Sequence, residues 1–99
     1  MTKISLNLKW SLNGGELSPG KYSNKHQIEF NDKIIINGDA APDWNGSEQN
    51  SNPEQALAAA LSSCHMMTFL ALAAKMNWPV SGYTAVSYTH LTLPTILRV

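Results

Sequence analysis

The sequence has one cysteine, one arginine and few charged residues, and each scarcity excludes a class of protein. Cys64 is the only cysteine in 99 residues, so the chain has neither an internal disulfide nor a cysteine-rich zinc site. Lysine plus arginine number 7 and aspartate plus glutamate number 7, which leaves no broad positive field for nucleic acid. We therefore expect no nucleic-acid partner, no cofactor and no bound metal.

The chain also lacks a convincing membrane or secretion segment. Its N-terminus is polar and has no apolar secretion run. The most apolar stretch, Ala56–Ala74, is rich in alanine and is interrupted by serine, histidine and threonine, which makes a poor membrane span. We expect no membrane partner and place the protein in the reducing cytoplasm.

Alternation of apolar and polar residues predicts short strands in the first half of the chain. Ile4–Trp10 has the period of two that is typical of a half-buried strand. Gln27–Asn31 and Lys33–Asn37 are two further strand candidates, and Asn31-Asp32 between them suits a hairpin turn. Gly38–Ser51, rich in polar residues and glycine, is predicted to be a loop.

A long helix follows this loop. Asn52 is a candidate N-cap, Pro53 suits the first helical position, and helix formers continue to about Lys75. Asn77 to Pro79 should end the helix, which would be about 35 Å long. Apolar residues lie all round it, which predicts burial on most sides, and the short strands can cover only one face. The fold class is therefore α+β.

The C-terminal tail has an unusual sequence. Val80–Leu93 is strand-like in composition, yet Val86–Thr95 agrees at every residue with one reading frame through a transposase-type sequencing-library adapter. We hypothesise that residues 86–99 are a non-native tail and that natural sequence ends near Ala85. An ordinary C-terminal strand is the alternative interpretation.

Cys64 is the candidate for chemistry. A lone cysteine in an apolar helix usually behaves as a small hydrophobic residue, and a reactive one needs a nearby cation or donor to form the thiolate. His65 is adjacent, but neighbouring helix residues do not face each other. We interpret His65 as structural.

The segment from Asn52-Pro53-Glu54 through a helix of small residues to Cys64 is similar to the signature of the OsmC/Ohr family. The spacing from Glu54 to Cys64 and the order of strands, polar loop and central helix resemble the family too. The likeness covers roughly Ile4–Ala85. It implies an OsmC-like fold, with residues 1–85 as the N-terminal portion of one domain whose C-terminal half is missing.

This resemblance implies a thiol peroxidase for organic hydroperoxides, acting in oxidative stress defence. Cys64 would attack the peroxide, a second cysteine would form a disulfide with it, and a dithiol reductant would restore the thiols. An arginine from the N-terminal loop would assist, held by Glu54. Members of the family form intertwined homodimers, so the resemblance implies a homodimer here, in which the second copy would cover the apolar helix.

The chain departs from this pattern in two ways. Its only arginine is Arg98, in the tail. The loop offers Lys21 and Lys25 instead, and Lys21 is the candidate stand-in for the loop arginine, although lysine lacks the planar fork of a guanidinium. The second cysteine is absent.

Three interpretations of function follow from these departures. The chain is a truncated and inactive copy of a peroxidase, a non-catalytic OsmC-like protein that binds small apolar ligands, or a fragment that does not fold stably. We favour the first.

The hypothesis about the tail is tested by sequencing the locus from genomic DNA. We expect the genomic reading frame to depart from this chain at or shortly after Val86. A natural gene that encodes the same residues to Val99 would contradict the adapter origin.

Overall fold

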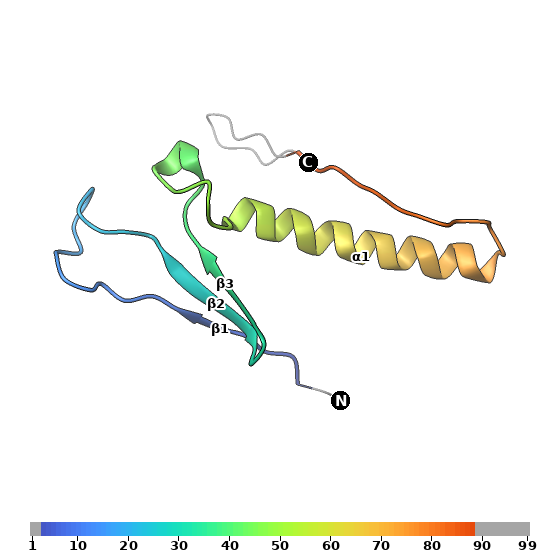
Figure 1. Ribbon diagram of the computed structural model, residues 1–99, viewed down its shortest axis with the longest axis horizontal. Helices are drawn as coiled ribbons and strands as arrows, with labels where there is room; N and C mark the ends of the chain where they lie inside the picture. The colour runs from blue at the N-terminus through green and yellow to red at the C-terminus, as the bar shows by residue number, and fades with distance from the viewer. Residues whose placement is uncertain (1–2, 89–99) are drawn as a thin grey trace. The chain divides into compact units, whose positions relative to one another are not determined.

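A computed structural model describes residues 3–88, which fall into two units. The first ends at Pro53 and carries three strands and a short 3-10 helix, and the second begins at Glu54 and carries one long helix (Figure 1). The predicted order of antiparallel strands followed by a long helix is confirmed, and with it the α+β class.

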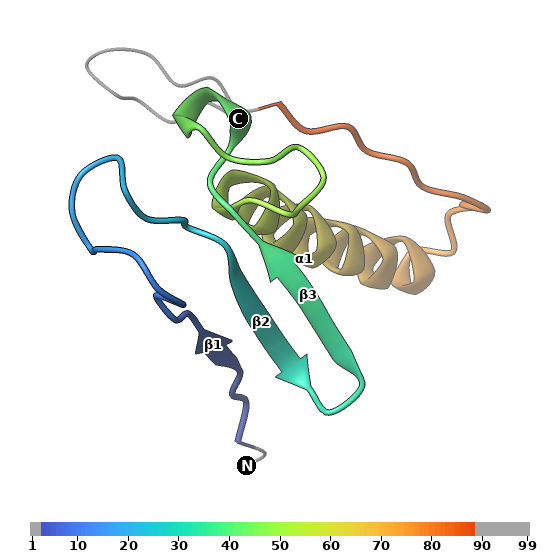
Figure 2. The ribbon, with the colours of Figure 1, turned by 60° about the vertical axis from the view of Figure 1, so that its left-hand side comes forward.

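The three strands form one antiparallel sheet in the order β1-β2-β3 (Figure 2). They span Asn7–Lys9 in β1, His26–Asn31 in β2 and Ile34–Gly38 in β3. At the hairpin between β2 and β3, the Asn31 side-chain oxygen accepts the N–H groups of Lys33 at 2.9 Å and Ile34 at 3.0 Å. The turn residues are therefore Asp32 and Lys33, one position later than predicted.

The sheet has one apolar and one polar face, because side chains alternate along each strand. On one face the register places Leu8 opposite Ile28 and Ile28 opposite Ile36. The next row, on the other face, is Lys9, Gln27 and Asn37. Lys9 Nζ also lies 3.2 Å from the carboxylate of Glu29 on this polar face.

β1 is shorter than the predicted strand Ile4–Trp10. Its pairing with β2 starts at Asn7, opposite Glu29, and the register of β2 against β3 shifts between Glu29 and Asn31. Such an irregularity twists a strand and disrupts the ladder locally. Ile4 and Leu6 continue the alternation of apolar and polar residues but lie outside β1, because a strand extends only as far as its partner offers hydrogen bonds.

The segment Gly38–Ser51 is more ordered than the predicted loop. It contains the 3-10 helix η1, Pro42–Trp44, which ends at Asn45 with a left-handed φ of 64°. Asp39 is only 5% exposed, and its carboxylate accepts the N–H groups of Ala40 at 2.8 Å and Ser47 at 3.1 Å. Asp39 thus ties the start of the segment to its middle.

The helix α1 spans Pro53–Lys75, which confirms its predicted start and end. Its C-terminus forms a Schellman motif, in which Trp78 N–H donates to Ala73 O at 2.9 Å and Asn77 N–H to Ala74 O at 3.2 Å. Asn77 takes the left-handed conformation that this motif needs, with φ 58°. The expectation that Asn77 to Pro79 end the helix is confirmed.

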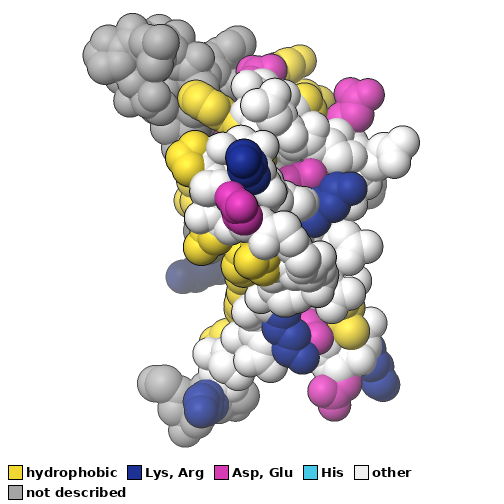
Figure 3. Space-filling model, turned by 90° about the vertical axis from the view of Figure 1, so that its left-hand side faces the viewer, with side chains coloured by type: hydrophobic (Ala, Val, Ile, Leu, Met, Phe, Trp, Pro, Cys, Tyr) yellow, Lys and Arg dark blue, Asp and Glu magenta, His cyan; other side chains and the backbone are white. Residues whose placement is uncertain are grey.

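The expected burial of α1 is wrong for the described chain. Ala73 is its one buried residue, and large side chains such as Leu61 and Met67 are 53% and 60% exposed. Exposed apolar side chains are not confined to α1: the space-filling view shows others beside polar and charged ones on the face turned towards the viewer (Figure 3). One chain of this length has too few elements to cover a helix that is apolar all round.

The same composition bears on the membrane question. By length and composition alone α1 is apolar enough to cross a membrane, with a mean hydropathy of 1.6 over its most apolar window. The core helix of a soluble protein satisfies the same criterion, so this result is weak evidence for a membrane span.

After α1 the chain runs back along the helix without forming the predicted strand (Figures 1 and 2). Ser87 Oγ lies 2.8 Å from Ser62 Oγ, and the Tyr83 ring lies 5.8 Å from the Phe69 ring. Residues 80–88 lack a neighbouring strand within the described residues, so the strand-like composition has no ladder to join. The rest of the predicted strand, and the tail beyond residue 88, lie outside the described residues.

Asp39 gives a test of this fold. Asp39→Asn removes one of two carboxylate oxygens that accept buried N–H groups, so we expect a loss of about 1–2 kcal/mol in the free energy of unfolding, measured in urea. Asp32→Asn, in the exposed β2–β3 turn, is the matched control and should change it by less than about 0.5 kcal/mol. Equal effects of the two substitutions would contradict the role given to Asp39.

Candidate functional site

Cys64 lies near the middle of α1, and its side chain is a free, exposed thiol. The carbonyl oxygen of Cys64 accepts a hydrogen bond from Thr68 Oγ1 at 3.0 Å, one helical turn later. A threonine hydroxyl that bonds to the carbonyl four residues back is a common local feature of helices and often bends them. Because the Cys64 side chain is exposed, its thiol is accessible to a small reagent in the described chain.

Glu54 lies in the first turn of α1 and has an unusual environment. Its Oε2 atom is buried and has no hydrogen-bond partner in the described structure. Buried carboxylate oxygens are ordinarily paired, so Oε2 is an open acceptor. Glu54 and Cys64 are separated by about 15 Å along the helix axis, so α1 does not bring them together.

Lys21, the candidate stand-in for an arginine, lies in the loop between β1 and β2. Its ammonium group is 3.9 Å from the Glu16 carboxylate in the same loop, and both side chains are largely exposed. An exposed pair of this kind contributes little to stability. Lys21 thus has a local partner, and its role beside Cys64 stays a prediction.

His65 is exposed on α1 and follows Cys64 directly. Among residues 3–88 no group of three or more histidine, cysteine, aspartate or glutamate side chains is arranged to hold a metal ion.

An apolar hollow in the first unit was not anticipated from the sequence. It has a volume of about 580 Å³, and Leu8, Trp10, Leu17 and Tyr22 line it. The Trp10 and Tyr22 rings meet edge to face at 6.4 Å, and Trp10 Nε1 donates to Ser23 O at 2.7 Å. The alternation of apolar and polar residues predicted that Trp10 lies on the apolar face of its strand. The segment Gly15–Lys25 is mostly polar, so nothing in the sequence indicated that its Leu17 and Tyr22 would line an apolar hollow with Trp10.

Comparison with known proteins is consistent with the helix motif. A family described as OsmC-like protein matches residues 46–95. A solved structure of an OsmC-like protein of unknown function from Vibrio cholerae aligns with a TM-score of 0.71 and 33% sequence identity, over 100% of this chain and 69% of that chain. No curated protein matches the sequence.

The family match includes Val86–Thr95, the segment whose origin as adapter stays a prediction. The matched region also contains Glu54, Cys64 and the whole of α1. On the combined evidence of sequence motif, fold and these matches, the chain belongs to the OsmC-like family.

Proposed function

We propose that the parent protein, meaning the natural full-length protein of which this chain is a truncated copy, is a thiol peroxidase. It reduces organic hydroperoxides in defence against oxidative stress, with Cys64 as the reacting residue. The observation that supports the proposal is an exposed thiol on the same helix that begins with Asn52-Pro53-Glu54, in a chain of the OsmC-like family. The family resemblance described above implies this activity, and the Vibrio cholerae relative is itself of unknown function.

The proposed chemistry needs only the thiol, the peroxide and an external reductant. The Cys64 thiolate attacks one peroxide oxygen, a sulfur–oxygen bond forms and the oxygen–oxygen bond breaks. The alkoxide leaves and takes a proton to become the alcohol, while Cys64 becomes a sulfenic acid. A thiol then condenses with the sulfenic acid, water leaves, and a dithiol reductant releases the Cys64 thiol from the resulting disulfide.

A positive charge beside Cys64 would favour the thiolate. The open Oε2 atom of Glu54 supports the proposal that a cationic side chain is held at the start of α1 in the complete protein. Lys21 is the residue of this chain that we assign to that role. As an ammonium it would act as a point charge and would orient less well than the planar guanidinium of an arginine.

We further propose that the protein is an intertwined homodimer. The exposed apolar side chains of α1, among them Leu57, Leu61 and Leu72, support a second copy as the cover for this helix. These side chains are about half exposed, so burial of the remainder would contribute about 1 kcal/mol for each. A helix covered in this way is part of a soluble protein, in keeping with a cytoplasmic and not a membrane location.

For the chain as it stands we propose little or no turnover. It has no second cysteine to form the disulfide with Cys64, and its only arginine is Arg98. The activity is therefore assigned to the parent protein, and the 99-residue chain is interpreted as an inactive copy.

The second candidate function is binding of small apolar ligands without catalysis. The apolar hollow beside Trp10 and Tyr22, with a volume of about 580 Å³, favours it. This volume is within the usual range for sites of small organic molecules. A ligand that quenches tryptophan fluorescence without oxidising Cys64 would support this candidate.

The peroxidase proposal is tested on a full-length version extended beyond Ala85 with natural sequence. We expect cumene hydroperoxide to block alkylation of Cys64, because the thiol becomes a sulfenic acid, and mass spectrometry should then detect one added oxygen. Cys64→Ser should abolish peroxide consumption and is the matched control. Alkylation that proceeds unchanged in the presence of peroxide would remove the activity and leave ligand binding.

The dimer proposal is tested by light scattering on the same protein. We expect twice the mass of one chain, and Leu61→Lys should shift the protein towards monomer because a charge would be buried without a partner. Leu12→Lys, in the segment between β1 and β2, is the control and should leave the mass unchanged. A monomer at all concentrations would contradict the proposal.

A further inference from the structure

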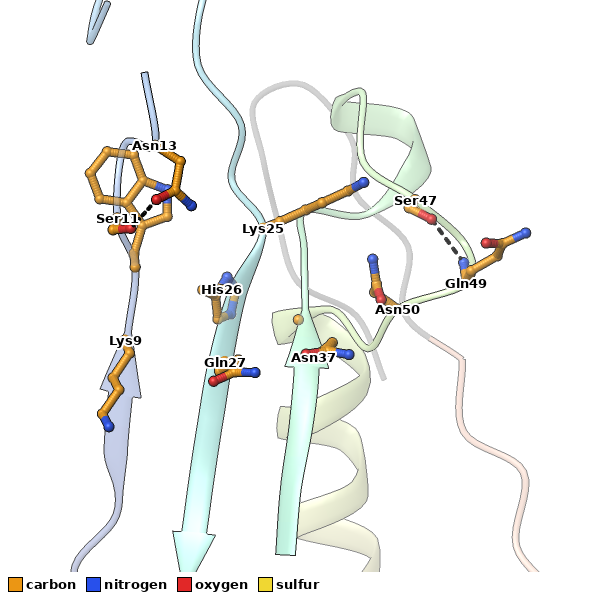
Figure 4. A pocket seen from close by; sticks show the side chains of 12 residues that line it. Lys9, Ser11, Asn13, Lys25, His26, Gln27, Asn37, Ser47, Gln49 and Asn50 are labelled. Carbon is orange, nitrogen blue, oxygen red and sulfur yellow. Dashed lines mark hydrogen bonds between the residues drawn. The ribbon is translucent and has the colours of Figure 1, made fainter. Parts of the chain in front are cut away.

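A second hollow lies on the polar side of the sheet, in the first unit, and none of the functions above uses it. Its volume is about 710 Å³. Figure 4 shows that its walls come from the strands β1, β2 and β3 and from the segment that carries Ser47, Gln49 and Asn50. The floor includes the polar row Lys9, Gln27 and Asn37, whose members are neighbours in the strand register.

The charges around this hollow are of one sign. Lys9 and Lys25 line it, and no aspartate or glutamate is among its lining residues in the described chain. Lys9 is engaged by Glu29 at 3.2 Å, whereas Lys25 forms no ion pair with any described residue. Figure 4 shows the Lys25 side chain extending towards Ser47 across the end of the sheet. Lys25 is therefore the free cation of this site.

The side chain of His26 lies on the opposite face of β2 from Gln27, because side chains alternate along a strand, and it also lines the apolar hollow. Its Nδ1 atom lies 2.7 Å from the carbonyl oxygen of Asn24, so Nδ1 carries a proton and donates it. The other side of the ring packs on Gly38, where even a Cβ atom would collide with the imidazole. The ring is therefore fixed on that face, and the ligand contacts in the polar hollow fall to Lys25 and the side-chain amides.

The amides supply donors and acceptors without charge. The carboxamide groups of Gln27 and Asn37 have no hydrogen-bond partner among the described side chains, and Asn50 lies on the opposite wall (Figure 4). Each carboxamide offers two donors and one acceptor, which is the pattern that reads hydroxyl groups. A ligand that fits this wall carries several hydroxyls.

We propose that this hollow binds a small hydroxylated molecule that carries a phosphate group, such as a sugar phosphate. Lys25 anchors the phosphate, and Gln27, Asn37 and Asn50 contact the hydroxyls. A phosphate fits better than a carboxylate because lysine acts as a point charge that suits a compact dianion.

The test is a titration of the ¹⁵N-labelled full-length version, extended beyond Ala85 with natural sequence, with glucose phosphate, followed by the shifts of backbone amides. We expect saturable shifts near Lys25, Gln27, Asn37 and Asn50, and weaker binding of inorganic phosphate or glucose alone. Lys25→Ala should weaken binding about tenfold, since a charge-assisted contact is lost. Lys33→Ala, which removes an exposed lysine of the β2–β3 turn, is the matched control and should bind as the parent chain does.

Two results would overturn the proposal. One is the absence of saturable shifts up to about 10 mM glucose phosphate, a concentration that would reveal even millimolar affinity. The other is equal weakening by Lys25→Ala and Lys33→Ala, which would indicate general charge attraction. Cys64→Ser should leave the binding unchanged, so the outcome is independent of the peroxidase proposal. Asn37→Ala, on the exposed polar face, gives a second variant that should weaken binding without removing charge.

Discussion

The need to cover α1 is the constraint on which the rest of this structure depends. A 23-residue helix with apolar side chains all round it has a single buried residue, Ala73, in the described chain, and many of its large apolar side chains are exposed. Leaving such a surface in water is unfavourable, and the free energy to be gained by covering it is comparable to the net stability of a small domain. Whatever packs on this helix also sets the surroundings of Cys64, so assembly and thiol chemistry are linked through the same surface.

Local signals made α1 predictable to the residue. Pro53 at the first position, a run of helix formers and Asn77 beyond the end act within one or two turns, and sequence alone contains all of them. β1 and the segment Gly38–Ser51 were harder, because their extents depend on partners distant in sequence. The pairing of β1 with β2 ends at Asn7, opposite Glu29, next to the register shift of β2. Asp39 is buried and accepts a hydrogen bond from the N–H group of Ser47, eight residues away.

The candidate site divides in the same way. Cys64 and Glu54 are found from the motif at the start of α1, since their spacing is written into one helix. The cation that would act on Cys64 cannot be found from this motif, because its position depends on how separate secondary-structure elements pack together. Lys21 was chosen because the loop between β1 and β2 contains lysine and no arginine. Its carboxylate neighbour in the structure is Glu16. The open oxygen of Glu54 could not be foreseen either, because burial of a single atom is a property of packing.

The position of β1 has a consequence for how the chain behaves in concentrated solution. As the outer member of the order β1-β2-β3, it presents unpaired backbone groups along one side, a template onto which another strand can add. Its length of three residues and the charge of Lys9 are features that discourage such edge-to-edge growth. Neutralising Lys9 would remove one of the two safeguards against aggregation.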